Sequence, residues 1–188
     1  MTNTLLTRHD PEEARRFHNN GTWGKETHYR LLDQNTKSRP DAFALRDGAR
    51  RLTWSQLNDW VEAVASDLAS QGLRSNDRVS LWASNRVESV VMYLACSRNG
   101  YACNPSLHRT YTVEEIAGLL ERLSTRAVWV EEGWGADVSR NDPFEALAKL
   151  PAMRKVYRVP AERTHRGHFP PPDGSKDNVP ESDENPDK

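Results

Sequence analysis

The sequence lacks long apolar runs. A membrane-spanning helix needs about 18 or more consecutive apolar residues, and none of the 188 residues lies in such a stretch. The first residues, MTNTLLTRHDPEEARRF, lack the apolar segment of a secretory signal peptide. We therefore predict a protein with no membrane span and a cytoplasmic location.

The sequence also has little net charge and few cysteines. Lys and Arg number 26 against 27 Asp and Glu, a formal net charge of −1, so the basic surface typical of nucleic-acid-binding proteins is missing and we expect no nucleic-acid partner. The two cysteines, Cys96 and Cys103, are spaced neither as C-x-x-C nor as zinc ligands. We predict two reduced, buried thiols and no metal site.

The stretch from residue 77 to residue 105, DRVSLWASNRVESVVMYLACSRNGYACNP, has the pattern of a strand, a helix and a second strand. We predict a strand over 78–83, a helix ending at Gly100, and an extended segment that Pro105 breaks. Asn85 is the expected helix cap, with the Glu88 side chain bound to the Asn85 N–H. The apolar positions of the helix predict one buried stripe: Val87, Val90, Val91, Leu94 and Ala95.

Similar signals flank this unit. Asp47-Gly48 predicts a hairpin, and capping boxes at Thr53-x-x-Gln56 and Thr112-x-x-Glu115 predict two further helices. Further strands are expected over 127–130 and 155–159, with a short helix around Phe144 between them. Alternating strands and helices predict an α/β fold in which a parallel sheet is flanked by helices.

We divide the chain into three parts. Residues 1–40 form an N-terminal helical extension, with one helix starting at Asp10 and a second at Thr27 whose Tyr29, Leu31 and Leu32 pack inward. Residues 41–159 form the α/β domain. Residues 160–188 hold many prolines and acidic residues and few apolar ones, so we predict a disordered, Pro-rich acidic linker.

The order of these motifs resembles the N-terminal subdomain of adenylate-forming, AMP-binding acyl-CoA synthetases. The motifs that carry the resemblance are Asp47-Gly48, TWSQL at 53–57, NDRV at 76–79, Asn85 to Glu88, Gly100, NPSL at 104–107 and YTVEEI at 111–116. Within the family, the set resembles the ligases of aryl, alicyclic and medium-chain acids, cyclohexanecarboxylate CoA ligases in particular.

The resemblance implies a two-step reaction. A carboxylate attacks ATP to form an acyl-adenylate, and the thiol of coenzyme A then takes the acyl group. ATP, Mg and coenzyme A are thus the implied cofactors, and a small carboxylic acid is the implied substrate, of the full-length family. The family's phosphate-binding loop, T-S-G-T-T-G-x-P-K, and its C-terminal catalytic lysine are not in this sequence. We therefore assign no catalytic residue or metal ligand and expect no cofactor bound by these residues alone.

The N-P-x-L loop offers one candidate contact. In some members a basic residue there approaches the phosphates of coenzyme A. Here the x is Ser106, and the nearest cations are His108 and Arg109. Arg109 is our candidate phosphate contact, against the alternative of a solvated loop arginine.

Two interpretations of function remain open. The first is a truncated AMP-dependent carboxylic acid:CoA ligase, inactive by itself. The alternative is a stand-alone, non-catalytic protein-interaction module whose expected partner is a full-length ligase. A small nucleotide-binding domain rests only on Gly133-Trp134-Gly135, which lacks the third glycine of G-x-G-x-x-G and predicts a turn. His165-x-x-His168 has metal-like spacing, but chance placement in the tail explains it.

Overall fold

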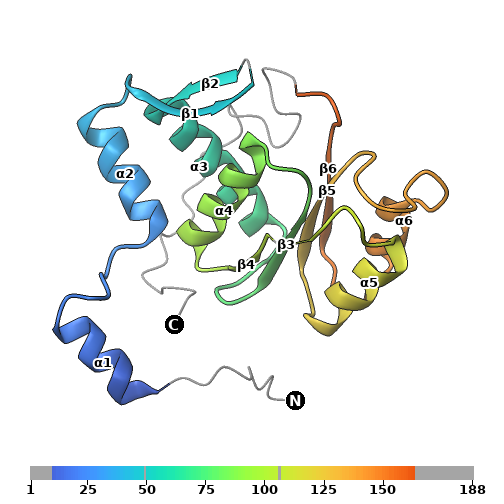
Figure 1. Ribbon diagram of the computed structural model, residues 1–188, viewed down its shortest axis with the longest axis horizontal. Coiled ribbons are helices and arrows are strands. Elements are labelled where there is room, and N and C mark those ends of the chain that lie inside the picture. The colour runs from blue at the N-terminus through green and yellow to red at the C-terminus, as the bar shows by residue number, and fades with distance from the viewer. Residues whose placement is uncertain (1–9, 49, 106, 164–188) are drawn as a thin grey trace.

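The computed structural model describes residues 10–48, 50–105 and 107–163. Its elements follow one another in this order (Figure 1): α1 Pro11–Asn19, α2 His28–Ser38, β1 Phe43–Asp47, β2 Arg50–Thr53, α3 Trp54–Ser70, β3 Arg78–Trp82, α4 Val87–Asn99, β4 Ala102–Asn104, α5 Val113–Arg122, β5 Ala127–Glu131, α6 Pro143–Ala148 and β6 Lys155–Val159. The expected order of hairpin, helices and strands is confirmed.

The larger sheet is parallel. Its strands lie in the order β4-β3-β5-β6, and every neighbouring pair runs in the same direction. Strands β1 and β2 form a separate antiparallel hairpin, whose turn contains Gly48 with a φ of +57°. The fold class predicted from the sequence is confirmed, as is the strand-helix-strand unit of β3, α4 and β4.

Helices cover both faces of the sheet, with α2, α3 and α4 on one side and α5 and α6 on the other (Figure 1). One core lies between the sheet and α2, α3 and α4, and includes Val79, Leu81 and Trp129 from the strands. The other lies between the sheet and α5 and α6, and includes Trp82 and Val128. Helices cover both faces of β5, so all five of its positions are buried, and four of the five residues are apolar.

Capping boxes and a C-terminal glycine correctly predict where several helices begin or end. Both predicted capping boxes, Thr53 with Gln56 and Thr112 with Glu115, are present with both of their hydrogen bonds. Gly100 ends α4 with a φ of +68°, in the left-handed region that favours glycine. These residues fix their own backbone through contacts three or four positions apart, so the sequence alone is enough to find them.

Two expected apolar stripes are partly wrong. Leu31 of α2 was expected to pack inward, but its side chain is 46% exposed, while Tyr29 and Leu32 are buried. In α4 the buried face contains Val87 and Val91 but also Met92 and Cys96, so Val90 lies at its exposed margin. Here α4 packs between α2 and α3 as well as on the sheet, which rotates the buried face away from the single stripe that the sequence predicts.

No helix in the part of the chain that the structure describes is long and apolar enough to cross a membrane. Tyr29 and Leu32 of α2 join the first core, whereas α1 has no buried residue. The division at residues 40 and 159 remains a prediction. The predicted linker from residue 164 on, with His165 and His168, lies outside the described residues, as does Ser106.

Candidate functional site at the carboxyl edge of the sheet

The four strands of the parallel sheet end at one edge, where open α/β sheets bind ligands. The segments that follow the strands there are residues 105–112 after β4, 83–86 after β3, 132–142 after β5 and 160–163 after β6. The turn of the β1-β2 hairpin is tied to this edge through Asp47, which accepts a hydrogen bond from the Val87 N–H.

Five charged side chains form an ionic cluster at this edge: Asp47, Arg50, Arg86, Glu88 and Glu131. Glu88 lies at its centre. Its Oε1 is 2.6 Å from Arg50 Nη1, and its Oε2 is 2.8 Å from Arg86 Nε. Arg50 also pairs with Asp47, and Arg86 Nη1 lies 3.2 Å from Glu131 Oε1. The five side chains are at most 10% exposed, so water screens these pairs little.

Backbone groups complete the cluster. The Ser84 N–H donates to Glu131 Oε2 at 2.6 Å, and the Val87 N–H donates to Asp47 Oδ2 at 3.1 Å. On the far side, Arg86 Nη1 donates to the Pro160 carbonyl oxygen at 2.7 Å. The cluster therefore joins the hairpin, the β3-α4 loop, the end of β5 and the segment after β6. A buried charge is tolerated only with such partners.

The arginines of the cluster favour the ionised forms of Asp47 and Glu88. Burial alone would raise the pKa of Glu88, but hydrogen bonds from Arg50 and Arg86 outweigh it and hold that pKa below its ordinary value. The pKa of Asp47 is lowered in the same way: burial opposes ionisation, and hydrogen bonds from Arg50 and the Val87 N–H overcome it. Carboxylates bound by guanidinium groups are poor general acids and poor nucleophiles. The arrangement fixes loops rather than performing chemistry.

The predicted role of Glu88 is wrong. The N-terminal cap of α4 is Arg86, not Asn85, and it makes no side-chain capping hydrogen bond. Glu88 does not reach back to the Asn85 N–H, because its carboxylate is taken by two buried arginines. Its partner Arg50 is 38 residues away in sequence. No local spacing indicates such a pair, so sequence reasoning missed the whole cluster.

Arg109, the candidate phosphate contact, lies in the loop after β4 and is exposed. Its guanidinium carbon lies 5.6 Å from the centroid of the Trp134 ring. The loop is anchored at His108, whose carbonyl oxygen accepts a hydrogen bond from Trp82 Nε1 at 3.0 Å. No salt bridge to Arg109 is found among the described residues, and its role as a phosphate contact remains a prediction.

The loop after β5 packs under this arginine. Gly133 and Gly135 have φ values of +74° and +151°, and Trp134 N–H bonds to the Glu131 carbonyl oxygen, as in the predicted turn. Gly135 lies against the Trp82 ring: a Cβ atom there would be 2.7 Å from Trp82 Cζ2. Glycine is therefore required at this position by close packing as well as by conformation.

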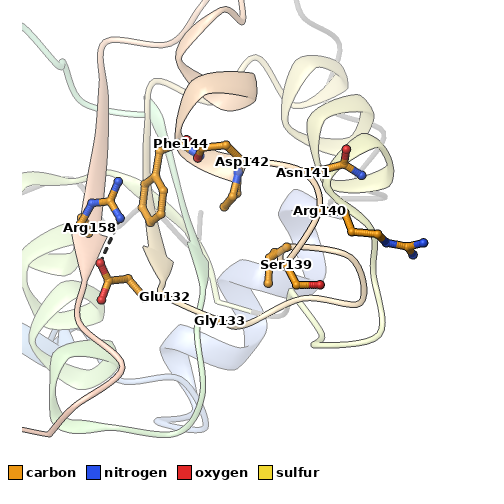
Figure 2. Close-up of a pocket in the computed structure, with 10 residues that line it drawn as sticks. Glu132, Gly133, Ser139, Arg140, Asn141, Asp142, Phe144 and Arg158 are labelled. Atoms are coloured by element: carbon orange, nitrogen blue, oxygen red, sulfur yellow. Dashed lines mark hydrogen bonds and ion pairs between the residues drawn. The ribbon is translucent and has the colours of Figure 1, made fainter.

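A shallow depression of about 420 Å³ lies beyond the ends of β5 and β6 (Figure 2). Arg158 lies over the Phe144 ring at 3.6 Å and pairs with Glu132 at 2.9 Å. The Arg140 guanidinium points away from the end of the depression that Arg158 and Phe144 line (Figure 2). Glu132 therefore neutralises the Arg158 charge where the two residues line the depression.

The cysteines form no metal site of the usual kind. Cys96 and Cys103 are free, and each Sγ lies 3.6 Å from Met92 Sδ. Burial, with a hydrogen bond to Cys103, raises the pKa of the Cys96 thiol. Cys96 is buried as predicted, whereas Cys103 is only half-buried. Among the described residues no group of three or more His, Cys, Asp or Glu could hold a metal ion.

Comparison with known proteins agrees with this architecture. The 3-[(3aS,4S,7aS)-7a-methyl-1,5-dioxo-octahydro-1H-inden-4-yl]propanoyl:CoA ligase of Mycobacterium tuberculosis is 34% identical over 131 residues, 70% of this chain and 25% of that ligase. A mitochondrial medium-chain acyl-CoA ligase of Bos taurus is 33% identical over 101 residues, 53% of this chain and 16% of that ligase.

A solved structure shows the same fold. The fatty acyl CoA synthetase of Mycobacterium tuberculosis superposes with a TM-score of 0.61 at 22% identity, over 71% of this chain and 26% of that one. This chain thus spans about a quarter or less of the two curated relatives. The family model of AMP-binding enzymes matches residues 32–187. The chain therefore belongs to the AMP-binding enzyme family.

Proposed function

We propose that these residues belong to an ATP-dependent carboxylic acid:CoA ligase and form its first α/β sheet. The observation that carries the proposal is the family match over residues 32–187, together with a 34% identical relative that is a CoA ligase. The reaction would be formation of an acyl-adenylate and then of a coenzyme A thioester, with ATP, Mg and coenzyme A as cofactors. These relatives favour the ligase over a stand-alone interaction module.

The role proposed for the described residues is structural support. In the ionic cluster every charge is paired with an opposite one, and the cluster joins four segments at the carboxyl edge, where the chain would meet the rest of the ligase. The 188 residues contain no loop of the T-S-G-T-T-G-x-P-K type. We therefore expect them alone to catalyse neither adenylate formation nor thioester formation.

The test is a pyrophosphate-exchange assay on the gene product, purified from the organism that carries the gene. Acid-dependent exchange of pyrophosphate into ATP is measured with alicyclic, aryl and medium-chain carboxylic acids, and the mass of the purified protein is recorded. Exchange with one of these acids supports the proposal. A gene product whose mass exceeds that of the 188 residues and that binds ATP, but that shows no exchange with any carboxylic acid, would contradict it.

We further propose that Arg109 contacts a phosphate of coenzyme A. Arg109 is exposed and follows His108, whose carbonyl oxygen is held by Trp82 Nε1. Its guanidinium carbon lies 5.6 Å from the centroid of the Trp134 ring. In the active ligase, Arg109→Ala should raise the KM for coenzyme A about tenfold, because a charge-assisted hydrogen bond is worth about 1.5 kcal/mol or more. Pyrophosphate exchange, which needs no coenzyme A, should not change. An unaltered KM for coenzyme A would remove this assignment.

A further inference from the structure

The segment after β6 is held by contacts to two distant parts of the chain. Arg163 Nη1 pairs with Asp47 at the hairpin turn, and Arg163 Nη2 donates to the Asn85 carbonyl oxygen at 3.1 Å. Three residues earlier, the Pro160 carbonyl oxygen accepts from buried Arg86. The partners of Arg163 lie 116 and 78 residues away in sequence, so these bonds are purely tertiary.

The two sides of the Arg163-Asp47 contact differ. The Asp47 side chain is 6% exposed and is already bound by Arg50 and the Val87 N–H, so its position is set without Arg163. Arg163 is 43% exposed and has left the last strand. The ionic cluster therefore presents a preformed carboxylate acceptor, and Arg163 docks on it from outside.

We propose that Arg163 is a positioning residue, which by docking on Asp47 and Asn85 fixes the direction in which the chain leaves the sheet after β6. The family match continues from there to residue 187. The inference rests on the proposed function for its consequence: in the ligase, Arg163 would set how the part that follows is placed against the carboxyl edge. The docking itself is a property of the described residues.

The proposal is tested by measuring backbone order at residues 161–163 by ¹⁵N relaxation of the 188-residue protein in solution. In the unaltered protein we expect order parameters near 0.85, typical of rigid backbone, and in Arg163→Ala we expect values below about 0.6. The Val87 amide, which donates to the same Asp47 carboxylate, should change its chemical shift. Arg163→Lys should restore part of the order, since an ammonium group can pair with Asp47 but lacks the second donor arm for Asn85.

The matched control is Arg158→Ala, which removes an exposed arginine from β6 whose partner is Glu132. It should leave residues 161–163 ordered. The thermal midpoint of Arg163→Ala should stay within about 3 °C of the unaltered protein, which separates positioning from general stability. Unchanged order parameters in Arg163→Ala would overturn the proposal. Since no acid, ATP or coenzyme A enters the experiment, this result is independent of the outcome of the exchange assay.

Discussion

Glu88→Gln is the most informative perturbation of the ionic cluster. Glutamine has the size of glutamate but no charge, so the change leaves packing intact and removes the anion between Arg50 and Arg86. Two buried cations then share only Asp47 and Glu131. Each arginine keeps one carboxylate but loses its charged hydrogen bonds to Glu88, which are worth about 1.5 to 3 kcal/mol per arginine. The glutamine N–H₂ group would also face guanidinium donors instead of an acceptor, so the change should cost about 3 to 5 kcal/mol.

That cost is large beside the stability of a whole domain, which is about 5 to 15 kcal/mol. At about 2 to 4 °C per kcal/mol for a chain of this size, the thermal midpoint should fall by about 10 °C. Urea unfolding followed by tryptophan fluorescence gives the free energy directly, since Trp60, Trp82 and Trp129 are buried and report on both cores. The matched control is Glu145→Gln, which breaks an exposed pair with Lys149 and should cost less than about 0.5 kcal/mol.

The pH dependence provides a second readout of the same variant. The folded-state pKa values of Asp47 and Glu88 are lowered, so their contribution to stability is fully present above about pH 5 and is lost as the pH falls through those values. Glu88→Gln should therefore lose less stability between about pH 5 and pH 2 than the unaltered protein. A Glu88→Gln protein within about 1 kcal/mol of the unaltered one at pH 7, with the same acid sensitivity, would refute the view that the cluster is a buried, compensated network.

Two further predictions concern packing and alkaline stability. Gly135→Ala should cost at least about 2 kcal/mol in urea unfolding, because the added Cβ atom would lie 2.6 Å from Val138 Cγ1 and 2.7 Å from Trp82 Cζ2. Gly118→Ala, an exposed helix position with nothing within 4 Å, should instead gain about 0.5 kcal/mol, and equal effects at the two glycines would contradict the packing argument. Burial, with a hydrogen bond to Asp67, raises the pKa of Tyr157, so its contribution is present below about pH 10 and lost above it. Between pH 8 and pH 11, the free energy of unfolding of Tyr157→Phe should therefore fall by about 1 kcal/mol less than that of the unaltered protein. Equal falls in the two proteins would show that Tyr157 ionises freely in the fold.

The sequence predicted the elements because their signals are local. A capping box joins residues three apart, and Gly100 ends α4 through its own φ angle, so Thr53, Thr112 and Gly100 were correctly interpreted. Strand β5 was recognisable from its continuous apolar run. The parallel sheet followed from the alternation of these elements. The resemblance to the AMP-binding enzymes came instead from the order of motifs such as NDRV at 76–79 and NPSL at 104–107.

Contacts between distant segments decided the rest. One partner of Glu88, Arg86, is close in sequence, but the other, Arg50, comes from the hairpin. The cap of α4 is Arg86, and the predicted cap at Asn85 does not form. Val90 fits a helical stripe but lies at the margin of the buried face, because α4 packs against α2, α3 and the strands at once.

The sequence by itself thus determined the fold class, the order of the elements and the family. Only the tertiary structure decided which charges meet at the carboxyl edge and where the segment after β6 is held. The physical reason is that a buried charge takes whichever partner the packed elements bring within about 3 Å, and that choice does not depend on spacing along the chain. Arg163 and Asp47 are 116 residues apart in sequence and in direct contact in the fold.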